Sequence, residues 1–591
     1  MPTTTPVSER QRKSATKSKL GPDQWTEWTH HLATRRHPRS LRDLIDTGRT
    51  SALEWPLHAD FPGSESADLL RYLDRFKSPK TRGNGELARR LEAWLDEAPQ
   101  RAPTALFAIE CLAWAHTMPE LAQLLPAAPW CQLQDQLVAI SRDAAGICLT
   151  DNPLAQQLLY GELPLALAYL FPEIDQCESL AEPARRALSD GILELLDGEG
   201  LINCRFHNTM RPLFASWTRC GCLGRSARQP CFETVAQDQY NWLVRESLRL
   251  ARFDGSQVLS HDDSGRWSPT LFETALKLVS RRTDSAIARE ALPARKKGTA
   301  QKEKAKTSPK LPEASVHSEW AGTAMLKRSW TRNDDSLVLT YHAQELAWEL
   351  NCRSEMLWSG KWDFEIEVDG KKLDVTDVWE EVCWVCDADV SYVEVEAKLS
   401  NGWRLQRQLL LGREDRFLFI ADAVLGNRPG RIKYKSSLPL VDGVQFRPAK
   451  ETCEGRLNGR RHLATVLPLA LPEWRLPAHG GSLEQTDEGL VLKQEVDGFR
   501  LFAPLFVDLK PARSKKRLTW RHLTVAQNLE IVSTDEAVGY RVQIGSEQWL
   551  FYRSLGPTGN RTLLGQNYSG EFIAARFPAT GGEAEKLIEI E

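Results

Sequence analysis

The stretch LPARKKGTAQKEKAKTSPKLPEASV, residues 292–316, separates two kinds of sequence in this chain. It is rich in Lys, Ala, Pro and Ser and contains almost no large apolar side chain. A segment of this composition cannot bury enough apolar surface to offset the entropy that ordering would cost. We therefore expect an interdomain linker over residues 291–317, whose positive charge could also hold an acidic polymer near the protein.

Upstream of the linker, apolar residues recur with helical spacing. In GELARRLEAWLDEA, residues 85–98, the side chains of Leu87, Leu91 and Trp94 fall on one face. Similar amphipathic stretches follow in succession, separated by short breaks that carry Pro, Gly, Asp or Asn. Because no repeat of fixed length is present, we expect an irregular α/α array or toroid-like domain over residues 23–290.

Downstream of the linker the apolar period changes to two. WDFEIEVDGKKLDV (residues 362–375) and SYVEVEAKLSNGWRLQRQLLL (residues 391–411) alternate apolar with polar residues around Asp-Gly and Asn-Gly turns. Such stretches continue to the end of the chain, which predicts a large antiparallel β-sandwich over residues 318–591. The expected fold class is thus an α-helical toroid-like domain followed by a large antiparallel β-sandwich.

The overall composition is that of a soluble globular protein, with 42% hydrophobic and 26% charged residues. A net charge of −3 gives no overall attraction to nucleic acid or to a membrane, so we expect neither as a partner. Residues 1–22 are polar and basic and lack the apolar stretch of a secretory signal, which favours a disordered tail on a cytoplasmic protein. We expect the 12 cysteines to be reduced and mostly buried.

A conspicuous polar cluster lies in LLDGEGLINCRFHNTMRPLF, residues 195–214, which places Arg205, His207 and Asn208 within four positions. A second Asp-Gly turn occurs in QYNWLVRESLRLARFDGSQVLSHDDSG, residues 239–265. Three strand-like stretches follow the linker: SEWAGTAMLKRSW from Ser318, TYHAQELAWEL from Thr340 and RFLFIADAVLG from Arg416. In this order the features resemble the heparinase II/III-like family of polysaccharide lyases.

The resemblance implies a helical toroid, a β-sandwich, and β-elimination of the C4 oxygen of a uronic acid in a cleft between the two domains. Elimination needs neutralisation of the carboxylate, a base at C5 and an acid at O4. On this template Asn208 and Arg205 address the substrate carboxylate, and His207 lies near the position of the base. Tyr341 or His342 comes from the sandwich. The implied partner is an acidic polysaccharide or oligosaccharide, and Tyr240 is a further candidate for contacting it.

Two positions depart from the family pattern. Phe206 stands where a catalytic Tyr is expected before the His, and a Phe has no hydroxyl to give or take a proton. His342, followed by Gln344 and Glu345, stands alone where the family has a His-x-His-x-Asp strand, so the usual metal ligands are incomplete and we expect no cofactor. The alternative hypothesis is therefore a catalytically inactive carbohydrate-binding or scaffolding protein with the same two domains.

Each candidate residue also has a structural interpretation. His207 and Asn208 can cap a helix that begins directly after them, since Asn is a favoured cap residue. Tyr341 and His342 occupy adjacent positions of an alternating strand, so one of them must face the core. Tyr240 belongs to YNWLV, which has the pattern of a buried helical face.

The cysteines and tryptophans suggest two further hypotheses. A tetrahedral zinc site could draw on five residues that fall within 28 positions, although their spacing is not that of paired zinc knuckles: Cys204, His207, Cys220, Cys222 and Cys231. Five of the 20 tryptophans gather early in the sandwich: Trp348, Trp358, Trp362, Trp379 and Trp384. They would suit a carbohydrate-binding surface if exposed and a hydrophobic core if buried.

Overall fold

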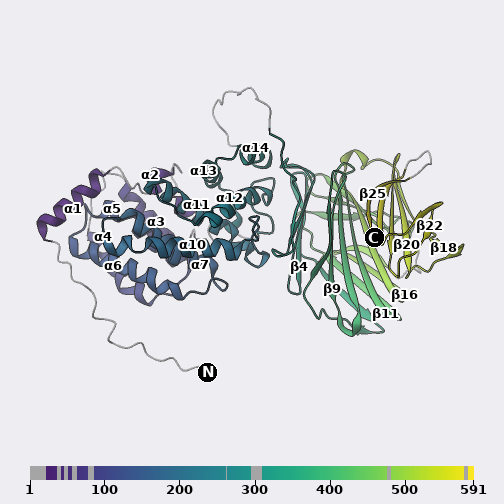
Figure 1. The fold of residues 1–591 in the computed structure, drawn as a ribbon. Coiled ribbons are helices and arrows are strands. Elements are labelled where there is room, and N and C mark those ends of the chain that lie inside the picture. Colours follow the sequence, from purple (N-terminus) through teal and green to yellow (C-terminus); the bar gives the residue numbers. More distant parts are fainter. Residues whose placement is uncertain are drawn as a thin grey trace. The chain divides into compact units, whose positions relative to one another are not determined.

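The computed structural model describes residues 21–35, 41–45, 51–55, 61, 63–77, 85–260, 263–294, 309–475, 481–577 and 584–591. Residues 1–20 of the predicted tail and 295–308 of the predicted linker lie outside these ranges. Within them, helices extend to Ala291 and a long series of antiparallel strands begins at Val316 (Figure 1). The predicted order, a helical region followed by a large antiparallel β region, is confirmed.

The chain folds as two compact units that do not follow chain order. The helical unit comprises Met1–Leu193, Pro212–Asp238 and Thr270–Leu278. The β unit comprises Glu194–Arg211, Gln239–Pro269 and Val279–Glu591. Both Asp-Gly turns found in the sequence therefore belong to the same unit as the sheets.

The helices arise from the amphipathic stretches seen in the sequence. They are α1 (Pro22–Thr34), α2 (Leu41–Leu44), α3 (Glu65–Asp74), α4 (Gly85–Glu97), α5 (Ala105–Leu121), α6 (Ala127–Asp143), α7 (Pro153–Gln156), α8 (Leu163–Leu170), α9 (Asp175–Glu178), α10 (Ala181–Leu195), α11 (Met210–Ala227), α12 (Thr234–Arg249), α13 (Pro269–Val279) and α14 (Arg282–Ala291). The predicted apolar face of α4 is buried. Helix α5 buries almost every side chain because apolar residues cover all of its faces, so it lies in the core of the helical unit.

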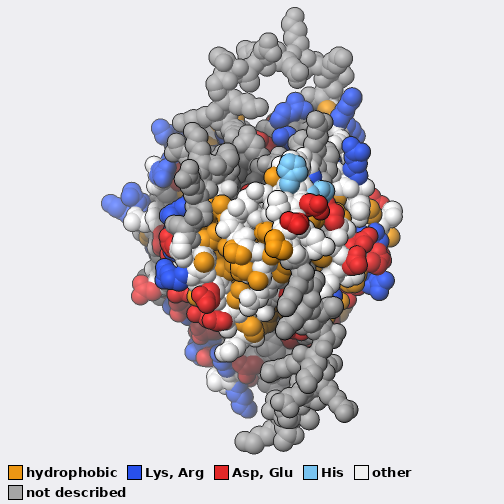
Figure 2. All heavy atoms as spheres, turned by 90° about the vertical axis from the view of Figure 1, so that its left-hand side faces the viewer, with side chains coloured by type: hydrophobic (Ala, Val, Ile, Leu, Met, Phe, Trp, Pro, Cys, Tyr) orange, Lys and Arg blue, Asp and Glu red, His pale blue; other side chains and the backbone are white. Residues whose placement is uncertain are grey.

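The surface of the helical unit is mixed in character. Hydrophobic side chains gather in the middle of the face drawn in Figure 2, and acidic and basic side chains lie around them. Among the described helices, none is both long enough and apolar enough to cross a bilayer.

The strands of the β unit form four antiparallel sheets. The first contains β1 (Val316–Ser318), β2 (Thr323–Lys327), β3 (Ser336–His342), β4 (Glu345–Cys352) and β5 (Glu355–Lys361). The second contains β6 (Asp363–Val368), β7 (Lys371–Lys372), β8 (Glu380–Cys386), β9 (Val390–Lys398), β10 (Arg404–Gly412), β11 (Phe417–Leu438), β12 (Gln445–Pro448), β13 (Gly455–Asn458), β14 (His462–Pro468), β15 (Ser482–Thr486) and β16 (Gly489–Asp508). The third contains β17 (Leu518–Leu523), β20 (Ala537–Ile544), β21 (Glu547–Ser554), β24 (Phe572–Arg576) and β25 (Glu585–Ile590), and the fourth β18 (Ala526–Gln527), β19 (Glu530–Ile531), β22 (Arg561–Leu563) and β23 (Gln566–Tyr568).

The four sheets stack as successive layers, which β4, β9, β20 and β22 mark in Figure 1. The second sheet is covered on both faces. In β10, Leu409 and Leu411 enter the core shared with the first sheet, whereas Leu410 enters the core shared with the third. Because successive side chains of a strand point to opposite faces, a sheet between two others needs apolar residues at both sets of positions. This explains the apolar run Leu409–Leu411, which departs from the alternation around it.

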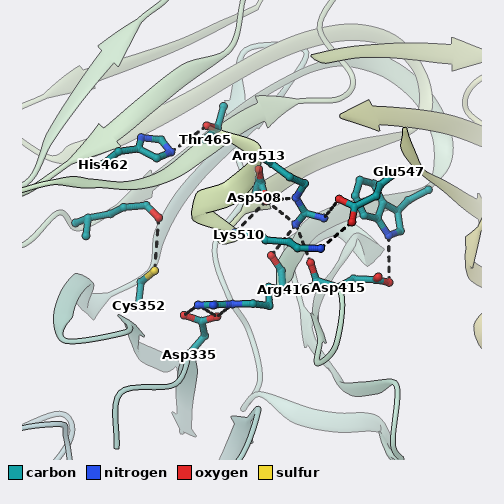
Figure 3. A network of polar contacts seen from close by, with 12 residues as sticks. Asp335, Cys352, Asp415, Arg416, His462, Thr465, Asp508, Lys510, Arg513 and Glu547 are labelled. Carbon is teal, nitrogen blue, oxygen red and sulfur yellow. Dashed lines mark hydrogen bonds and ion pairs between the residues drawn. The ribbon is translucent and has the colours of Figure 1, made fainter. Parts of the chain in front are cut away.

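A buried ionic network joins three of the layers (Figure 3). Arg513 donates to Asp508 at the end of β16 over 2.8 Å and to Glu547 of β21 over 3.1 Å. Arg416 in the β10–β11 turn donates to both carboxylate oxygens of Asp335, at 2.9 and 3.1 Å. Buried charges of this kind are costly to leave without a partner, so the network constrains how the sheets can stack.

Candidate active site

The first Asp-Gly turn reverses the chain after α10. The Asp197 carboxylate accepts hydrogen bonds from the backbone N–H groups of Glu199 (2.9 Å) and Leu201 (3.0 Å). Gly200 has a φ of +91°, and a Cβ at this position would lie 2.4 Å from the backbone nitrogen of Leu243. Only glycine satisfies both conditions, so the sequence DGEG fixes the point where the chain turns back.

The second turn reverses the chain after α12 in the same way. The Asp254 carboxylate accepts from the backbone N–H of Ser256 (2.9 Å) and from its hydroxyl (2.6 Å). The Arg252 N–H donates to the carbonyl of Ser256 over 2.7 Å. Gly255 has a φ of +85°, and a Cβ there would lie 2.5 Å from the Trp267 ring. Each turn is thus set locally by an Asp side chain and a required glycine.

His207 joins the two turns. It lies in the 3₁₀ helix η7 (Cys204–Thr209), which Asn203 caps through its side chain. The His207 ring is 6% exposed, and its Nε2 lies 2.8 Å from the carbonyl oxygen of Val258. Gln257 returns a hydrogen bond to the His207 carbonyl over 2.8 Å. Burial lowers the pKa of His207, so the ring is neutral and Nε2–H donates to Val258.

The 3₁₀ helix is fixed against the first sheet. The Cys204 N–H donates to the carbonyl of Ala321 over 2.8 Å, and the Asn203 side chain donates to the carbonyl of Trp320 over 2.9 Å. The Cys204 thiol lies 3.6 Å from the carbonyl oxygen of Tyr341 at the end of β3. The segment bearing Arg205 and Asn208 is therefore held beside the strand that bears Tyr341.

Glu349 of β4 holds the second turn against the same sheet. Its carboxylate is fully buried and accepts two hydrogen bonds from the Arg252 guanidinium, at 2.9 and 2.6 Å. It also accepts from the Leu259 N–H (2.8 Å) and the Asn351 amide (2.7 Å). A paired guanidinium and two further donors compensate the loss of water around a buried carboxylate.

Lys327 of β2 supplies a further link between the sheet and α12. Its ammonium donates to the carbonyl of Arg249, the last residue of the helix, over 3.0 Å. Burial lowers the pKa of Lys327 to about 7. A cation at this place is favoured by the helix dipole, because the C-terminal carbonyls carry partial negative charge.

Tyr341 and His317 form a hydrogen-bonded pair at the edge of this assembly. The Tyr341 ring is 5% exposed, and its hydroxyl lies 2.9 Å from Nε2 of His317, whose ring stacks on Trp384 at 5.3 Å. Burial lowers the pKa of His317 to about 4. Burial, followed by the carboxylates of Glu381 and Glu319, raises the pKa of Tyr341. Both groups are therefore neutral at pH 7, with the phenol donating to the imidazole.

The other candidate residues from the sequence are divided between the surface and the core. Arg205 and Asn208 are exposed on η7, and the Arg205 guanidinium lies 4.5 Å from the centre of the Phe206 ring. His342 is exposed at the end of β3, on the strand face opposite the buried tyrosine that precedes it. Tyr240 is 1% exposed within α12. The structure thus groups η7 with the end of β3 and leaves Tyr240 in the protein interior.

Two residues of this region were not identified from the sequence. His317 fell at the last position of the predicted linker, although it belongs to β1, which pairs with β2 across a turn at Gly322. Trp320 in that turn is 51% exposed. The signal that could have found both is the glycine in EWAGTAML, which permits a tight hairpin and extends the sheet upstream.

The five tryptophans that gather early in the β region lie in or against its hydrophobic core. Trp348, Trp358, Trp362 and Trp379 are buried in the core between the first and second sheets, and Trp384 packs against that core. Of the two alternatives for this group, the structure therefore supports the hydrophobic core. Side chains of this size contribute more by burial between two sheets than they would in water, and the strands direct them there.

The thiols give no support to the zinc hypothesis. In the described part of the chain, no group of three or more His, Cys, Asp and Glu side chains is placed to share a metal ion. Burial raises the pKa of Cys204 and Cys222 to about 11 and that of Cys231 to about 12, and raises that of Cys220 well above its ordinary value. These thiols are therefore protonated in the arrangement that the structure shows.

The contacts of His207 predict a loss of stability on its removal. His207→Ala is expected to lower the free energy of unfolding by about 2–4 kcal/mol, because it leaves a cavity and a buried carbonyl without its donor. Asn208→Ala, at the next and exposed position, is the matched control and should change it by less than about 0.5 kcal/mol. Urea denaturation of both variants measures the difference. Equal stability of the two variants would contradict the inference that His207 stabilises the protein by linking the two Asp-Gly turns.

Comparison with known proteins shows which solved structures share this fold. No protein-family model and no curated protein sequence matches the chain. Among solved structures, a heparinase III is similar with a TM-score of 0.57 and 10% identity, over 90% of this chain and 95% of that one. The heparan sulfate lyase HepC from Pedobacter heparinus is similar with a TM-score of 0.56 and 10% identity, over 90% of this chain and 94% of that one. The distant resemblance to heparinase II/III-like proteins is thus confirmed for the fold: this chain shares the helical and β architecture of those lyase structures over most of its length.

Proposed function

We propose that the protein is a polysaccharide lyase that cleaves a uronic-acid-containing polysaccharide or oligosaccharide by β-elimination. The observation that carries the proposal is the 2.9 Å hydrogen bond between the Tyr341 hydroxyl and His317. This neutral pair can move one proton, and it lies on the sheet against which η7, with its exposed Arg205 and Asn208, is fixed. The fold shared with heparan sulfate lyase structures supports the same class of reaction.

The proposed chemistry assigns each group one task. The Asn208 amide and the Arg205 guanidinium bind the substrate carboxylate and spread the charge that develops when C5 loses its proton. The Tyr341 oxygen takes that proton while its own proton passes to Nε2 of His317. The pair then returns one proton to the departing O4, so that both residues end in their starting states.

Neighbouring residues position these four proposed functional side chains. Phe206 takes no part in proton transfer, and its ring supports the Arg205 guanidinium. His207 fixes the turn behind η7 through Val258. The exposed indole of Trp320 offers an apolar face on which a sugar ring can stack. In this proposal Tyr341 supplies the hydroxyl that is missing at position 206.

The low pKa of His317 predicts a broad pH profile. The imidazole must be neutral to accept the phenol proton, and its pKa of about 4 keeps it neutral well below pH 6.5. We therefore expect kcat/KM to hold from about pH 8 to about pH 5 and to fall as the pH passes through about 4. Because the folded pKa lies below the ordinary value, the His317 contribution to stability is complete above pH 6.5 and is also lost as the pH falls toward 4. Circular dichroism at each pH separates the two effects, and a rate that already halves near pH 6.5 would contradict the proposal.

The proposal is tested with the purified full chain and a panel of uronic-acid polymers and oligosaccharides. Elimination leaves a C4–C5 double bond beside the carboxylate, so the expected result is a rise in ultraviolet absorbance on at least one substrate. The rise should disappear in His317→Gln. No absorbance change on any uronate substrate, with the fold intact by circular dichroism, would refute lyase activity.

A second candidate function is binding of the same acidic saccharide without cleavage. It is favoured by Phe206, which has no hydroxyl, and by the small exposed area of Tyr341. Isothermal titration with the same panel distinguishes it. Binding that Asn208→Ala weakens, in the absence of any ultraviolet product, would replace the lyase proposal by this one.

A further inference from the structure

A cavity of about 750 Å³ lies in the β unit, between β16 of the second sheet and β17 and β20 of the third. Its aromatic lining includes Trp474, Phe502, Trp520, His522 and Tyr540. Phe502 and Tyr540 belong to the core between the second and third sheets, whereas the candidate active site adjoins the first. The cavity is therefore a separate place, and its volume falls within the roughly 300–1,000 Å³ of small-ligand pockets.

One polar group of this cavity is buried without a hydrogen-bond partner among the described residues. Gln494 lines it, and its side-chain Nε2 is buried without an acceptor. Tyr540 also lines the cavity and is buried, and its burial raises the pKa of its hydroxyl. The exposed His522 ring packs at 5.3 Å against Tyr540. Buried polar groups are nearly always hydrogen-bonded in folded proteins, so the Gln494 amide points to a ligand that supplies its missing acceptor.

The charges around the cavity exclude an anionic ligand. Four carboxylates line it against two guanidinium groups: Glu473, Glu495, Asp497 and Asp535 against Arg500 and Arg521. Both guanidinium groups are already engaged, since Arg521 pairs with Glu473 and Arg500 donates to the Asp535 carbonyl over 3.1 Å. A uronate or sulfated sugar would meet net negative charge here.

The ligand must therefore be uncharged and able both to donate and to accept hydrogen bonds. Carboxylates only accept, whereas the Gln494 Nε2 needs an acceptor. A cation would satisfy the carboxylates but not the amide. Sugar hydroxyl groups do both, and the apolar face of a pyranose ring can stack on an exposed indole. Trp474, which lines the cavity and is 54% exposed, provides that indole.

We propose that this cavity binds a neutral saccharide, with one ring stacked on Trp474 and hydroxyl groups bonded to Gln494, Tyr540 and the lining carboxylates. The site is distinct from the proposed lyase site in both place and charge preference. A polysaccharide that contains both neutral sugars and uronates has units suited to each of the two proposed sites.

The test is isothermal titration of the full chain with neutral trisaccharides, namely cellotriose, maltotriose and xylotriose. A trimer of uronic acid and a trimer of glucosamine serve as charged comparisons. We expect binding of at least one neutral trimer and no binding of the uronate trimer at this site. Trp474→Ala should weaken the neutral trimer at least about tenfold, and Tyr540→Phe about threefold to tenfold.

Phe499→Ala is the control. Phe499 is an exposed aromatic residue of β16, a strand that borders the cavity, but Phe499 does not itself line the cavity. It should leave the dissociation constant unchanged. His317→Gln should also bind the trimer normally, which keeps the outcome independent of any lyase activity. The proposal is overturned if no neutral trimer binds, if a charged trimer binds in preference, or if Trp474→Ala binds as the unaltered chain does.

Discussion

Tyr341→Phe is expected to lower kcat/KM for elimination on a uronate substrate by roughly 10²- to 10⁴-fold, the range for losing a proton-transferring group. The phenylalanine ring fills the same buried space, so packing is preserved. The variant loses the hydrogen bond to His317, which costs about 0.5–1.5 kcal/mol of stability. The measurement is the initial rate of ultraviolet product formation, together with urea denaturation.

Tyr240→Phe is the matched control for this change. Tyr240 is a second buried tyrosine of the β unit, on α12 rather than on the strand paired with His317. We expect it to keep nearly full activity. A large loss in Tyr240→Phe with an active Tyr341→Phe would move the proton-transferring role to α12 and disprove the pair proposed here.

Glu349→Ala is expected to give the largest loss of stability, about 3–5 kcal/mol, because it leaves the Arg252 guanidinium buried without its carboxylate. The Leu259 N–H loses its acceptor at the same time. Since Glu349 holds the second Asp-Gly turn against the first sheet, we also expect weaker saccharide binding at the site that we propose on η7. Urea denaturation and titration with a uronate oligosaccharide measure the two effects.

Glu345→Ala is the control on the same strand. Glu345 is an exposed residue of β4 that pairs with the exposed Lys361, and such surface pairs contribute little. Its removal should change the free energy of unfolding by less than about 1 kcal/mol. If Glu349→Ala proved as mild, the carboxylate would not be the link that we infer between the turn and the sheet.

Much of the fold follows from periodicity alone. A helical spacing such as that of Leu87 and Leu91, and the alternation in WDFEIEV, are local consequences of how side chains project from a helix and a strand. The number of stacked sheets cannot be predicted from this periodicity. The apolar run at Leu409–Leu411 shows that both strand faces are buried, but it does not reveal which sheets cover them.

The candidate site likewise combines features that the local sequence sets with features that tertiary contacts set. The sequence determined where the two Asp-Gly turns lie and which polar residues follow them, because an Asp side chain and a glycine set a turn through contacts within a few residues. Only the tertiary structure decided that His207 is buried against Val258, that Glu349 binds Arg252 across 97 positions, and that Tyr341 meets His317. These contacts join distant segments through the packing of sheets and turns, and no local pattern encodes which partner a buried polar group will find.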